Sequence, residues 1–507
     1  MSGVLRRDAT SSAGADGHVT EPDDRLPVLV WIIAAAFVGV ELAFSAGYGF
    51  QQDELYFIQA GRHLAFGYVD QPPVAPLLTR LVTMIGGIDP TAVRTLPALA
   101  GGAIVVLAAR QAAILGAGRV GRVLAALCLA SAPVLLGAVH IGNTTPPALL
   151  AWTLVVLCVT TAIGRDRPRW WLGAGLAAGL GLQTNNLVAL LLLALAVGLL
   201  VTGRADVLAT RWPWLGGAVA AIIWAPNVMW QATHGWPQFE MAASLHRENT
   251  SQAAYLGGLP AQILYGGLLT APVLIAGVVW LWRSPRMRYL AVTVTVVAVY
   301  VLAWVPGKPY YTSGLLPAVL AAGSVATERW FARGRRPFGR RTLVVGAILV
   351  ATVVELPTLL PVWPVRDLHA HTTSGDLADT VGWPQLAQFV ATENATLAAS
   401  GTPPTSIFTG NYAEAAALDV LGPAGLPPVL SGHNAYGMWG PGSASDARVL
   451  AVDAADELRP YFGNCAKVDT FVAPYDVDTD FNHLDLSLCS GPTTDWAGLW
   501  PHLTHDD

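Results

Sequence analysis

Residues 170–200 read "WWLGAGLAAGLGLQTNNLVALLLLALAVGLL", an apolar stretch interrupted by the four polar residues 183–186. A helix that crosses the hydrocarbon core of a membrane needs about 20 apolar residues, so the stretch could be one long crossing or two short ones. The choice decides the topology of the whole chain, because each crossing reverses the side on which the following loops lie.

The composition indicates that the protein is embedded in a membrane. The chain has 507 residues, of which 53% are hydrophobic and only 12% are charged, and its mean hydropathy is +0.48. Soluble domains carry about 25% charged residues, so a polytopic membrane protein is the better interpretation. The net charge of -5 and the lack of a basic stripe argue against a nucleic-acid partner. We expect no nucleotide site, since the sequence contains neither a P-loop nor a glycine fingerprint after a strand.

The arginines resolve the choice at residues 170–200. If this stretch crosses twice, every arginine-rich loop lies on one side, which the positive-inside rule identifies as the cytoplasm. With a single crossing, all later arginine clusters would lie on the outer side. We therefore predict about eleven transmembrane helices, at residues 27–47, 94–114, 122–140, 145–163, 170–185, 187–202, 213–230, 259–281, 289–305, 312–328 and 342–362.

This topology divides the chain into three parts. Residues 1–24 are polar and are expected to form a disordered cytoplasmic tail, and residues 25–362 form the transmembrane domain. Residues 363–507 lie outside, and their alternating strand and helix patterns predict a small extracytoplasmic α/β domain. The other segments expected outside are the loops 48–93, 231–258 and 306–311.

The four cysteines fall into two pairs. Cys128 and Cys158 lie in apolar runs and are expected to pack in the core. Cys465 and Cys489 lie in the outer domain, where an oxidising compartment would permit a disulfide. Sharing a domain is weak evidence for pairing, so the sequence leaves open whether these two are bridged.

A pair of carboxylates stands where the chain leaves its first apolar span. Asp53 and Glu54 lie in the loop 48–93, which also carries Arg62 and Asp70. Desolvation near a membrane can raise the pKa of a carboxylate toward the range in which it acts as a general base. The alternative is that these carboxylates are solvated and only mark the membrane boundary.

Further candidates lie in the other outer loops. Lys308, followed by Tyr310 and Tyr311, could bind a phosphate group, or it could be an interfacial lysine that extends toward lipid headgroups. His234 could be a ligand for a substrate or metal, or a structural histidine of the interface.

Five segments carry a resemblance to a known family. In order along the chain, they are "QQDELYFIQAGRHLAFGYVDQPP", "PNVMWQATHGWPQFE", "GKPYYTSGLLPAVLAAG", "NYAEAAALDVLG" and "SGHNAYGMWGPG". Together they resemble bacterial members of the protein O-mannosyltransferase and aminoarabinose-transferase superfamily (glycosyltransferase family 39), which has the GT-C fold. The resemblance implies a multi-pass protein of the bacterial cell membrane. Its expected activity is transfer of a sugar from a polyprenyl-phosphate donor to a hydroxyl of a lipid, glycan or protein.

The resemblance also assigns roles to individual residues. Asp53 matches the catalytic carboxylate of the family, with Glu54 beside it, and Lys308 and Tyr310 match a motif near the carrier phosphate. Asp70 and His234 match positions near the donor phosphate or a divalent metal ion. The chain departs from many members at "GNTTPP", residues 142–147, where they have an acidic residue, and at Asn185, where they have a lysine.

The resulting hypothesis is an inverting displacement. Asp53 accepts a proton from the acceptor hydroxyl, while Lys308 and Arg62 offset the charge that develops on the leaving phosphate. Tyr311 offers a further hydroxyl donor, and a divalent ion between Asp70 and His234 is an optional addition. Two alternatives remain open from the sequence: a transporter or flippase of a lipid-linked substrate, and a non-catalytic sugar-binding scaffold.

Overall fold

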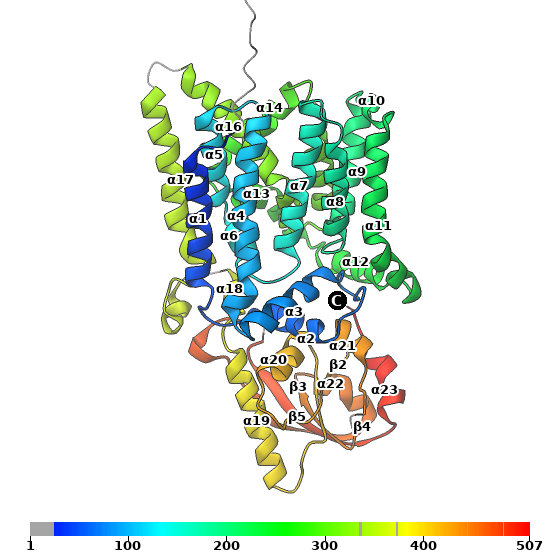
Figure 1. The fold of residues 1–507 in the computed structure, drawn as a ribbon. Coiled ribbons are helices and arrows are strands. Elements are labelled where there is room, and N and C mark those ends of the chain that lie inside the picture. Colours follow the sequence, from blue (N-terminus) through cyan, green and yellow to red (C-terminus); the bar gives the residue numbers. More distant parts are fainter. Residues whose placement is uncertain (1–24, 334–336, 372–373, 444, 480, 507) are drawn as a thin grey trace, which may run out of the picture.

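The computed structural model describes residues 25–506 except for 334–336, 372–373, 444 and 480. The expected tail 1–24 lies outside the described residues. The described chain forms a bundle of helices and, at one end of it, a domain built on a mixed sheet (Figure 1).

Every predicted span overlaps a helix or a bent pair of helices, with differences of several residues at the ends. The bundle contains α1 (Val28–Phe44), α4 (Pro90–Ile114), α5 (Arg119–Ala130), α6 (Pro133–Val139), α7 (Thr145–Gly164), α8 (Trp170–Leu182), α9 (Leu187–Val201), α10 (Ala205–Leu208), α11 (Arg211–Thr233), α13 (Gln252–Gly266), α14 (Ala271–Arg283), α15 (Arg288–Trp304), α16 (Leu316–Ala332) and α17 (Pro337–Leu359).

Not all of these helices are long enough to qualify as spans on their own. Among the described residues, three helices are long and apolar enough to cross a membrane, and five qualify if each bent pair counts as one span. Several others are short: α8 has 13 residues and α9 has 15. At 1.5 Å per residue, these helices are about 20–23 Å long, less than the roughly 30 Å of a hydrocarbon core. The chain is thus a multi-pass membrane protein, and the number of eleven crossings stays a prediction.

The polar interruption in residues 170–200 separates two helices, as predicted. α8 ends at Leu182 and α9 begins at Leu187. The side-chain carbonyl of Asn185 accepts a hydrogen bond from the Leu187 amide at 2.9 Å, and the Thr184 hydroxyl donates to the Gly181 carbonyl at 2.7 Å. These side chains satisfy backbone groups that the two helix ends leave without partners.

The expected span 259–281 is not one continuous helix. Residues 260–266 and α14 are bent by 107° across the break between them. Gly267 has φ +92°, a conformation that glycine adopts far more readily than other residues, and Pro272 fixes the start of α14. The turn chemistry of "GGLLTAP" therefore overrides the apolar character on which the prediction of a single span was based.

Four short helices lie in the segments that connect helices of the bundle. They are α2 (Gln52–Arg62), α3 (Val74–Gly86), α12 (Pro237–Glu248) and the 3₁₀ helix η1 (Pro309–Leu315). α2 begins at a capping box, in which the Gln51 side chain accepts from the Asp53 amide and the Glu54 side chain accepts from the Gln51 amide. In Figure 1, α2 and α3 lie directly between the bundle and the sheet domain.

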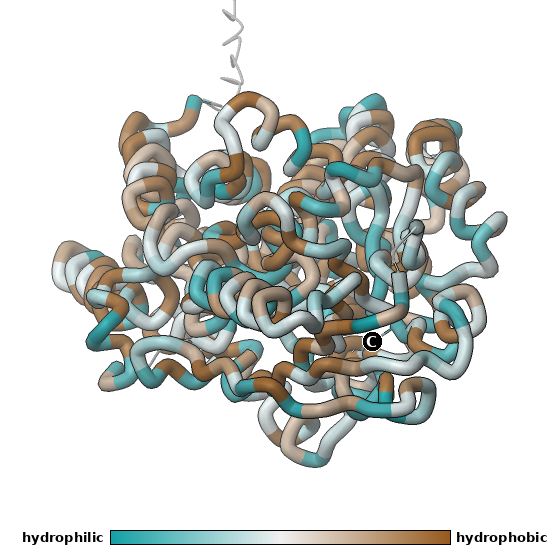
Figure 2. The backbone as a smooth tube through the Cα atoms, turned by 90° about the horizontal axis from the view of Figure 1, so that it is seen from below, coloured by the Kyte–Doolittle hydropathy of each residue, from teal (hydrophilic) through white to brown (hydrophobic). Residues whose placement is uncertain are grey.

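The C-terminal part has the predicted α/β character. Its sheet has the order β2-β1-β3-β5-β4, with β1 parallel to β2 and β3, and β5 antiparallel to β3 and β4. Its elements are η2 (Val365–Ala370), α18 (Gly375–Ala378), α19 (Trp383–Ala399), β1 (Ser406–Thr409), α20 (Tyr412–Leu421), β2 (Val429–Ser431), α21 (Asn434–Trp439), β3 (Arg448–Val452), α22 (Ala455–Leu458), η3 (Arg459–Tyr461), β4 (Phe462–Phe471), η4 (Pro474–Asp476), β5 (Leu484–Pro492) and α23 (Trp496–Leu503). Seen from this end, hydrophilic and hydrophobic residues alternate along the chain (Figure 2). Cys465 and Cys489 form a disulfide between directly paired residues of β4 and β5, which answers the question left open by the sequence.

One hydrophobic core joins the segment that contains α2 to the sheet domain. Leu55 and Phe57 of α2 belong to the same buried cluster as Leu386, Ala417 and Leu450 of the C-terminal part. The expected boundary at residue 363 therefore separates two segments of sequence but not two cores. α2 is held by the sheet domain as well as by the bundle.

Candidate active site

Asp53 lies in the first turn of α2, half-buried, between the bundle and the sheet domain. Its Oδ1 accepts a hydrogen bond from the Tyr412 hydroxyl at 3.0 Å, and its Oδ2 accepts one from the side-chain amide of Asn143 at 3.3 Å. Burial raises the pKa of Asp53 above its usual 3.8, and the two hydrogen bonds oppose this shift only in part. Asp376 raises the pKa further, while Lys308 lowers it. A carboxylate with a raised pKa is a stronger base than a free one, which is the direction that a proton acceptor needs.

Asp53 lines a cavity of about 470 Å³, which we call the Asp53 cavity. Its polar side chains include those of Asn143, Thr145, Tyr310 and Asp376, and the remaining wall is mostly apolar. The wall comes from α6, α7, α13, η1 and α17 of the helical part and from α18 of the C-terminal part. The cavity therefore meets both parts of the molecule at the carboxylate.

Asp70 lines a second cavity, of about 450 Å³, which we call the Asp70 cavity. Polar side chains of Asp70, Asn185 and Tyr311 lie in its wall, together with a long apolar surface formed by Leu187, Leu190, Leu193, Met241, Leu245 and Trp304. Tyr56 donates a hydrogen bond to Asp70 Oδ1 at 3.1 Å. Burial raises the pKa of Asp70 from 3.8 to about 7, although the Tyr56 hydrogen bond lowers it.

The segment that carries Lys308 lies between these two cavities. Tyr310 lines the Asp53 cavity and Tyr311 lines the Asp70 cavity, and both line a small gap together with Asn185 and Thr145. Lys308 immediately precedes η1, is half-buried, and is close enough to lower the pKa of Asp53. The segment 308–311 thus lies beside both cavities, and a role of Lys308, Tyr310 and Tyr311 in binding a phosphate stays a prediction.

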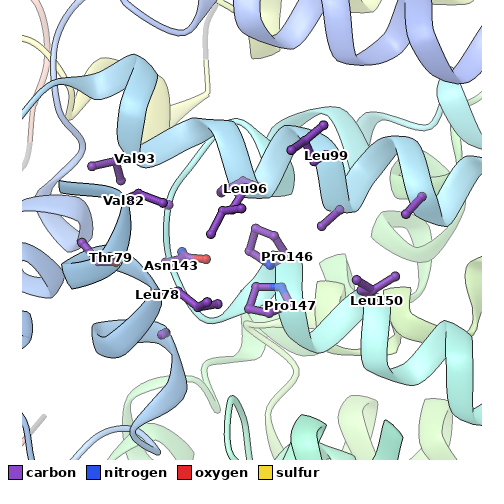
Figure 3. Close-up of a pocket in the computed structure, with 15 residues that line it drawn as sticks. Leu78, Thr79, Val82, Val93, Leu96, Leu99, Asn143, Pro146, Pro147 and Leu150 are labelled. Carbon is purple, nitrogen blue, oxygen red and sulfur yellow. The ribbon is translucent and has the colours of Figure 1, made fainter. Parts of the chain in front are cut away.

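A third cavity, of about 350 Å³, is almost wholly apolar. Figure 3 shows it between α3, α4 and α7, with Asn143 among the apolar side chains. Leu96 and Leu99 of its wall are exposed on α4. Asn143 lines both this cavity and the Asp53 cavity, and its side chain donates a hydrogen bond to Asp53. The two cavities are therefore neighbours at Asn143, next to the carboxylate.

Glu54 occupies a structural position. It forms a two-pronged ion pair with Arg94, with Nε–Oε1 at 2.9 Å and Nη2–Oε2 at 2.8 Å, and both side chains are almost completely buried. Glu54 also accepts hydrogen bonds from the Gly142 and Gln51 amides. These partners favour a role in fixing α2 against α4 and the turn before α7, in place of the catalytic role expected beside Asp53.

Arg62 is also placed differently from the expectation. It lies nine residues after Asp53, at the other end of α2, which corresponds to about 14 Å along the helix axis. Its guanidinium donates to Gln59 at 3.0 Å and to the Asp419 carbonyl at 3.3 Å, so it faces the sheet domain. It lines neither the Asp53 cavity nor the Asp70 cavity.

His234 stands apart from the carboxylates. It is exposed at the end of α11, its ring is stacked on Trp230 at 4.1 Å, and its Nδ1 lies 2.8 Å from the Trp230 carbonyl. Within the described part of the chain, His, Cys, Asp and Glu side chains form no group of three or more that could hold a metal ion. The donor set expected from Asp70 and His234 therefore does not fit a metal site.

The structure adds Asn143 and Tyr412 as direct partners of Asp53. Both lie in segments that the sequence had already marked. Asn143 belongs to "GNTTPP", where the chain departs from many family members, and Tyr412 belongs to "NYAEAAALDVLG". The signal was present, but nothing in the sequence linked either residue to Asp53.

Comparisons with known proteins concern the family and the fold of the chain. Residues 70–230 match the family model described as dolichyl-phosphate-mannose-protein mannosyltransferase. No curated protein matches the chain significantly. The crystal structure of ArnT from Cupriavidus metallidurans bound to undecaprenyl phosphate is similar, with 16% sequence identity, a TM-score of 0.62, and coverage of 91% of this chain and 97% of that one.

A second solved structure is related more distantly. The oligosaccharyltransferase AglB from Archaeoglobus fulgidus, in complex with an inhibitory peptide and a dolichol-phosphate, has 10% identity and a TM-score of 0.50, with coverage of 94% of this chain and 77% of that one. At these identities, the likeness shows that the chain shares the helical GT-C-like fold, with a C-terminal mixed sheet as in this structure.

Proposed function

We propose that this chain, which belongs to the dolichyl-phosphate-mannose-protein mannosyltransferase family of membrane glycosyltransferases, transfers a sugar from a polyprenyl-phosphate carrier to a hydroxyl acceptor. The observation that carries the proposal is the position of Asp53. This carboxylate has a raised pKa, lies on the wall of the 470 Å³ cavity, and is close to the only lysine of the helical part.

The Asp70 cavity suits the donor. An isoprenoid chain would lie along the apolar surface that includes Leu190, Leu193 and Trp304, and its phosphate would reach the polar end. Lys308 supplies the positive charge for that phosphate, and the hydroxyls of Tyr310 and Tyr311 supply hydrogen bonds. The sugar would then extend past η1 into the Asp53 cavity.

The reaction is a single displacement. Asp53 accepts the proton of the acceptor hydroxyl while the acceptor oxygen forms a bond to the anomeric carbon. The bond from that carbon to the carrier phosphate oxygen breaks, and the phosphate leaves with the electron pair, so the configuration inverts. General-base assistance of this type contributes about 10²–10⁴-fold to the rate, and Lys308 offsets the charge that grows on the leaving phosphate.

The topology of the proposal follows the arginine distribution. Residues 25–362 cross the bacterial cell membrane eleven times with the N-terminus in the cytoplasm, and residues 363–507 with the loops 48–93, 231–258 and 306–311 lie outside. In this scheme, Arg62 and Glu54 hold α2 against its neighbours. Asp70 and His234 bind no metal ion. Within the residues that the structure describes, no group of three or more His, Cys, Asp or Glu side chains could hold a metal ion, so the proposed reaction uses none.

The test is transfer by the purified protein in lipid across a panel of polyprenyl-phosphate sugars, including mannose and arabinose donors. Asp53→Asn keeps the shape of the side chain but removes the base, so we expect kcat to fall by about 10²–10⁴-fold. Asp456→Asn changes an exposed carboxylate of the sheet domain and serves as the matched control.

Two outcomes would contradict the proposal. Undiminished transfer by the Asp53→Asn protein would exclude this residue as the base. Movement of the labelled lipid between leaflets of a vesicle, with no glycosylated product from any donor, would favour a transporter.

A further inference from the structure

Tyr412 reaches the candidate base from the opposite end of the chain. It is the first residue of α20, and the turn before it is fixed by two local hydrogen bonds. The Asn411 side chain accepts from the Ala413 amide at 2.8 Å, and the Thr409 hydroxyl donates to the Asn411 carbonyl at 2.9 Å. The start of α20 therefore has a defined direction, which points the Tyr412 hydroxyl at Asp53, 359 positions earlier in the sequence.

Two aromatic rings pack against the ring of Tyr412. Its centroid lies 4.7 Å from that of Tyr56 and 4.9 Å from that of His433, which is edge-on to it. Tyr56 donates to Asp70 at 3.1 Å and accepts from the Ala435 amide at 3.3 Å. The sheet domain thus contacts Asp53 directly through Tyr412, whereas it reaches Asp70 only indirectly, through the Ala435 amide and the Tyr56 hydroxyl of α2.

We propose that Tyr412 is a positioning residue for Asp53, so that the C-terminal domain completes the active site. This inference rests on the proposed function, in which Asp53 is the general base. The shorter hydrogen bond, from Tyr412, anchors Oδ1 of Asp53. The hydrogen bond from Asn143 to Oδ2 is longer, so Oδ2 is the oxygen that receives the proton of the acceptor. A base that is fixed in the reactive orientation avoids the loss of rate that accompanies a mobile one.

The hydroxyl has a second, measurable effect. A hydrogen bond donated to a carboxylate favours its charged form and lowers its pKa, in line with the direction found for Tyr412 on Asp53. Hydrogen bonds to charged groups are strong enough that losing one shifts a carboxylate pKa by about one to two units. Without the Tyr412 hydroxyl, the pKa of Asp53 rises, and the base is active only at higher pH.

The experiment compares Tyr412→Phe with the wild type, as full-length protein in lipid nanodiscs. Dicyclohexylcarbodiimide labels protonated carboxyl groups, so its reaction with Asp53, followed by mass spectrometry against pH, reports the pKa without any need for activity. We expect the labelling midpoint to rise by about one to two pH units. In the transfer assay, the acidic limb of kcat should move in the same direction, and kcat at pH 7 should fall while KM for the donor changes little.

Tyr436→Phe is the matched control. The Tyr436 hydroxyl donates to Asp419 at 2.8 Å in the same contact between α2 and the sheet domain, but it does not touch Asp53. Its removal should leave both the labelling midpoint and the acidic limb where they are. 3-Fluorotyrosine is nearly the size of tyrosine but is a stronger hydrogen-bond donor, so placing it at position 412 should move the labelling midpoint to lower pH. This replacement tests the proposal even if the phenylalanine variant does not fold.

The outcomes separate this inference from the proposed function. A folded Tyr412→Phe protein with an unchanged labelling midpoint would overturn the positioning role. An equal loss of kcat in Tyr412→Phe and Tyr436→Phe, with no shift of the labelling midpoint, would overturn it as well. If the midpoint shifts but the wild type transfers no sugar from any donor, the positioning contact stands and the proposed function fails.

Discussion

The buried ion pair between Glu54 and Arg94 yields the sharpest prediction for stability. Both side chains are about as buried as side chains can be, with 0% and 1% of their surface exposed. Arg94 also donates to the Ser45 carbonyl at 2.7 Å and to the Gly49 carbonyl at 2.8 Å, so the pair joins α4 to the segment that leads into α2. The perturbation is Arg94→Gln, which leaves the Glu54 carboxylate buried without its cation.

The magnitude follows from the burial. Removing one partner of a buried pair costs about 3–5 kcal/mol, because the remaining charge has lost its solvent and its counter-charge. Glu54→Gln should cost a similar amount. The double variant removes both charges, so its cost should fall short of the sum of the single costs by more than the roughly 0.5 kcal/mol within which independent sites add.

The assay is the free energy of unfolding in lipid, measured by steric trapping for the wild type, both single variants and the double variant. Arg459→Gln serves as the control, since it breaks an exposed pair with Asp456 and should cost less than about 1 kcal/mol. A loss below about 1 kcal/mol for Arg94→Gln, or strict additivity of the two single changes, would refute the reasoning.

Two further predictions concern the cavities. Since the pKa of Asp70 is raised from 3.8 to about 7 in the folded protein, the folded state holds a proton that the unfolded state releases, so stability should fall as pH rises from about 4 to 7. Asp70→Asn should flatten that slope, and an equal slope in both proteins, measured as unfolding free energy against pH, would contradict the assignment. Leu190→Trp should raise KM for the donor by about tenfold or more by filling the Asp70 cavity, whereas Ala100→Trp in the third cavity should not. The opposite result in steady-state kinetics would move the isoprenoid chain to the third cavity.

Hydropathy was enough to locate most of the helices of the bundle, whereas the sidedness inferred from the arginines stays a prediction. The polar residues 183–186 end one helix and begin the next, as predicted, because polar side chains can bond the backbone groups that helix ends expose. The bend near Gly267 was missed, since the prediction weighed apolar length above turn-forming residues. The glycines and the proline of "GGLLTAP" were a local signal for a turn there.

The partners of the carboxylates were not available from the sequence. Asp53 and Glu54 are neighbours on α2, so their side chains point about 100° apart, and one meets the cavity while the other meets Arg94. Arg94 is 40 positions from Glu54 and Tyr412 is 359 positions from Asp53. Local patterns carry no information about such pairings, which depend on how the sheet domain and the bundle close on α2.

The common core of α2 and the sheet domain has a consequence for biogenesis. α2 leaves the ribosome hundreds of residues before α20, which it packs against through contacts such as that of Gln59 with Asp419. During synthesis, the apolar side chains of α2 therefore stay uncovered until the sheet domain has been made and has folded against them. A nascent chain that ends before α20 therefore lacks the Tyr412 partner of Asp53, and the surroundings of this carboxylate are complete only after the far end of the chain has docked.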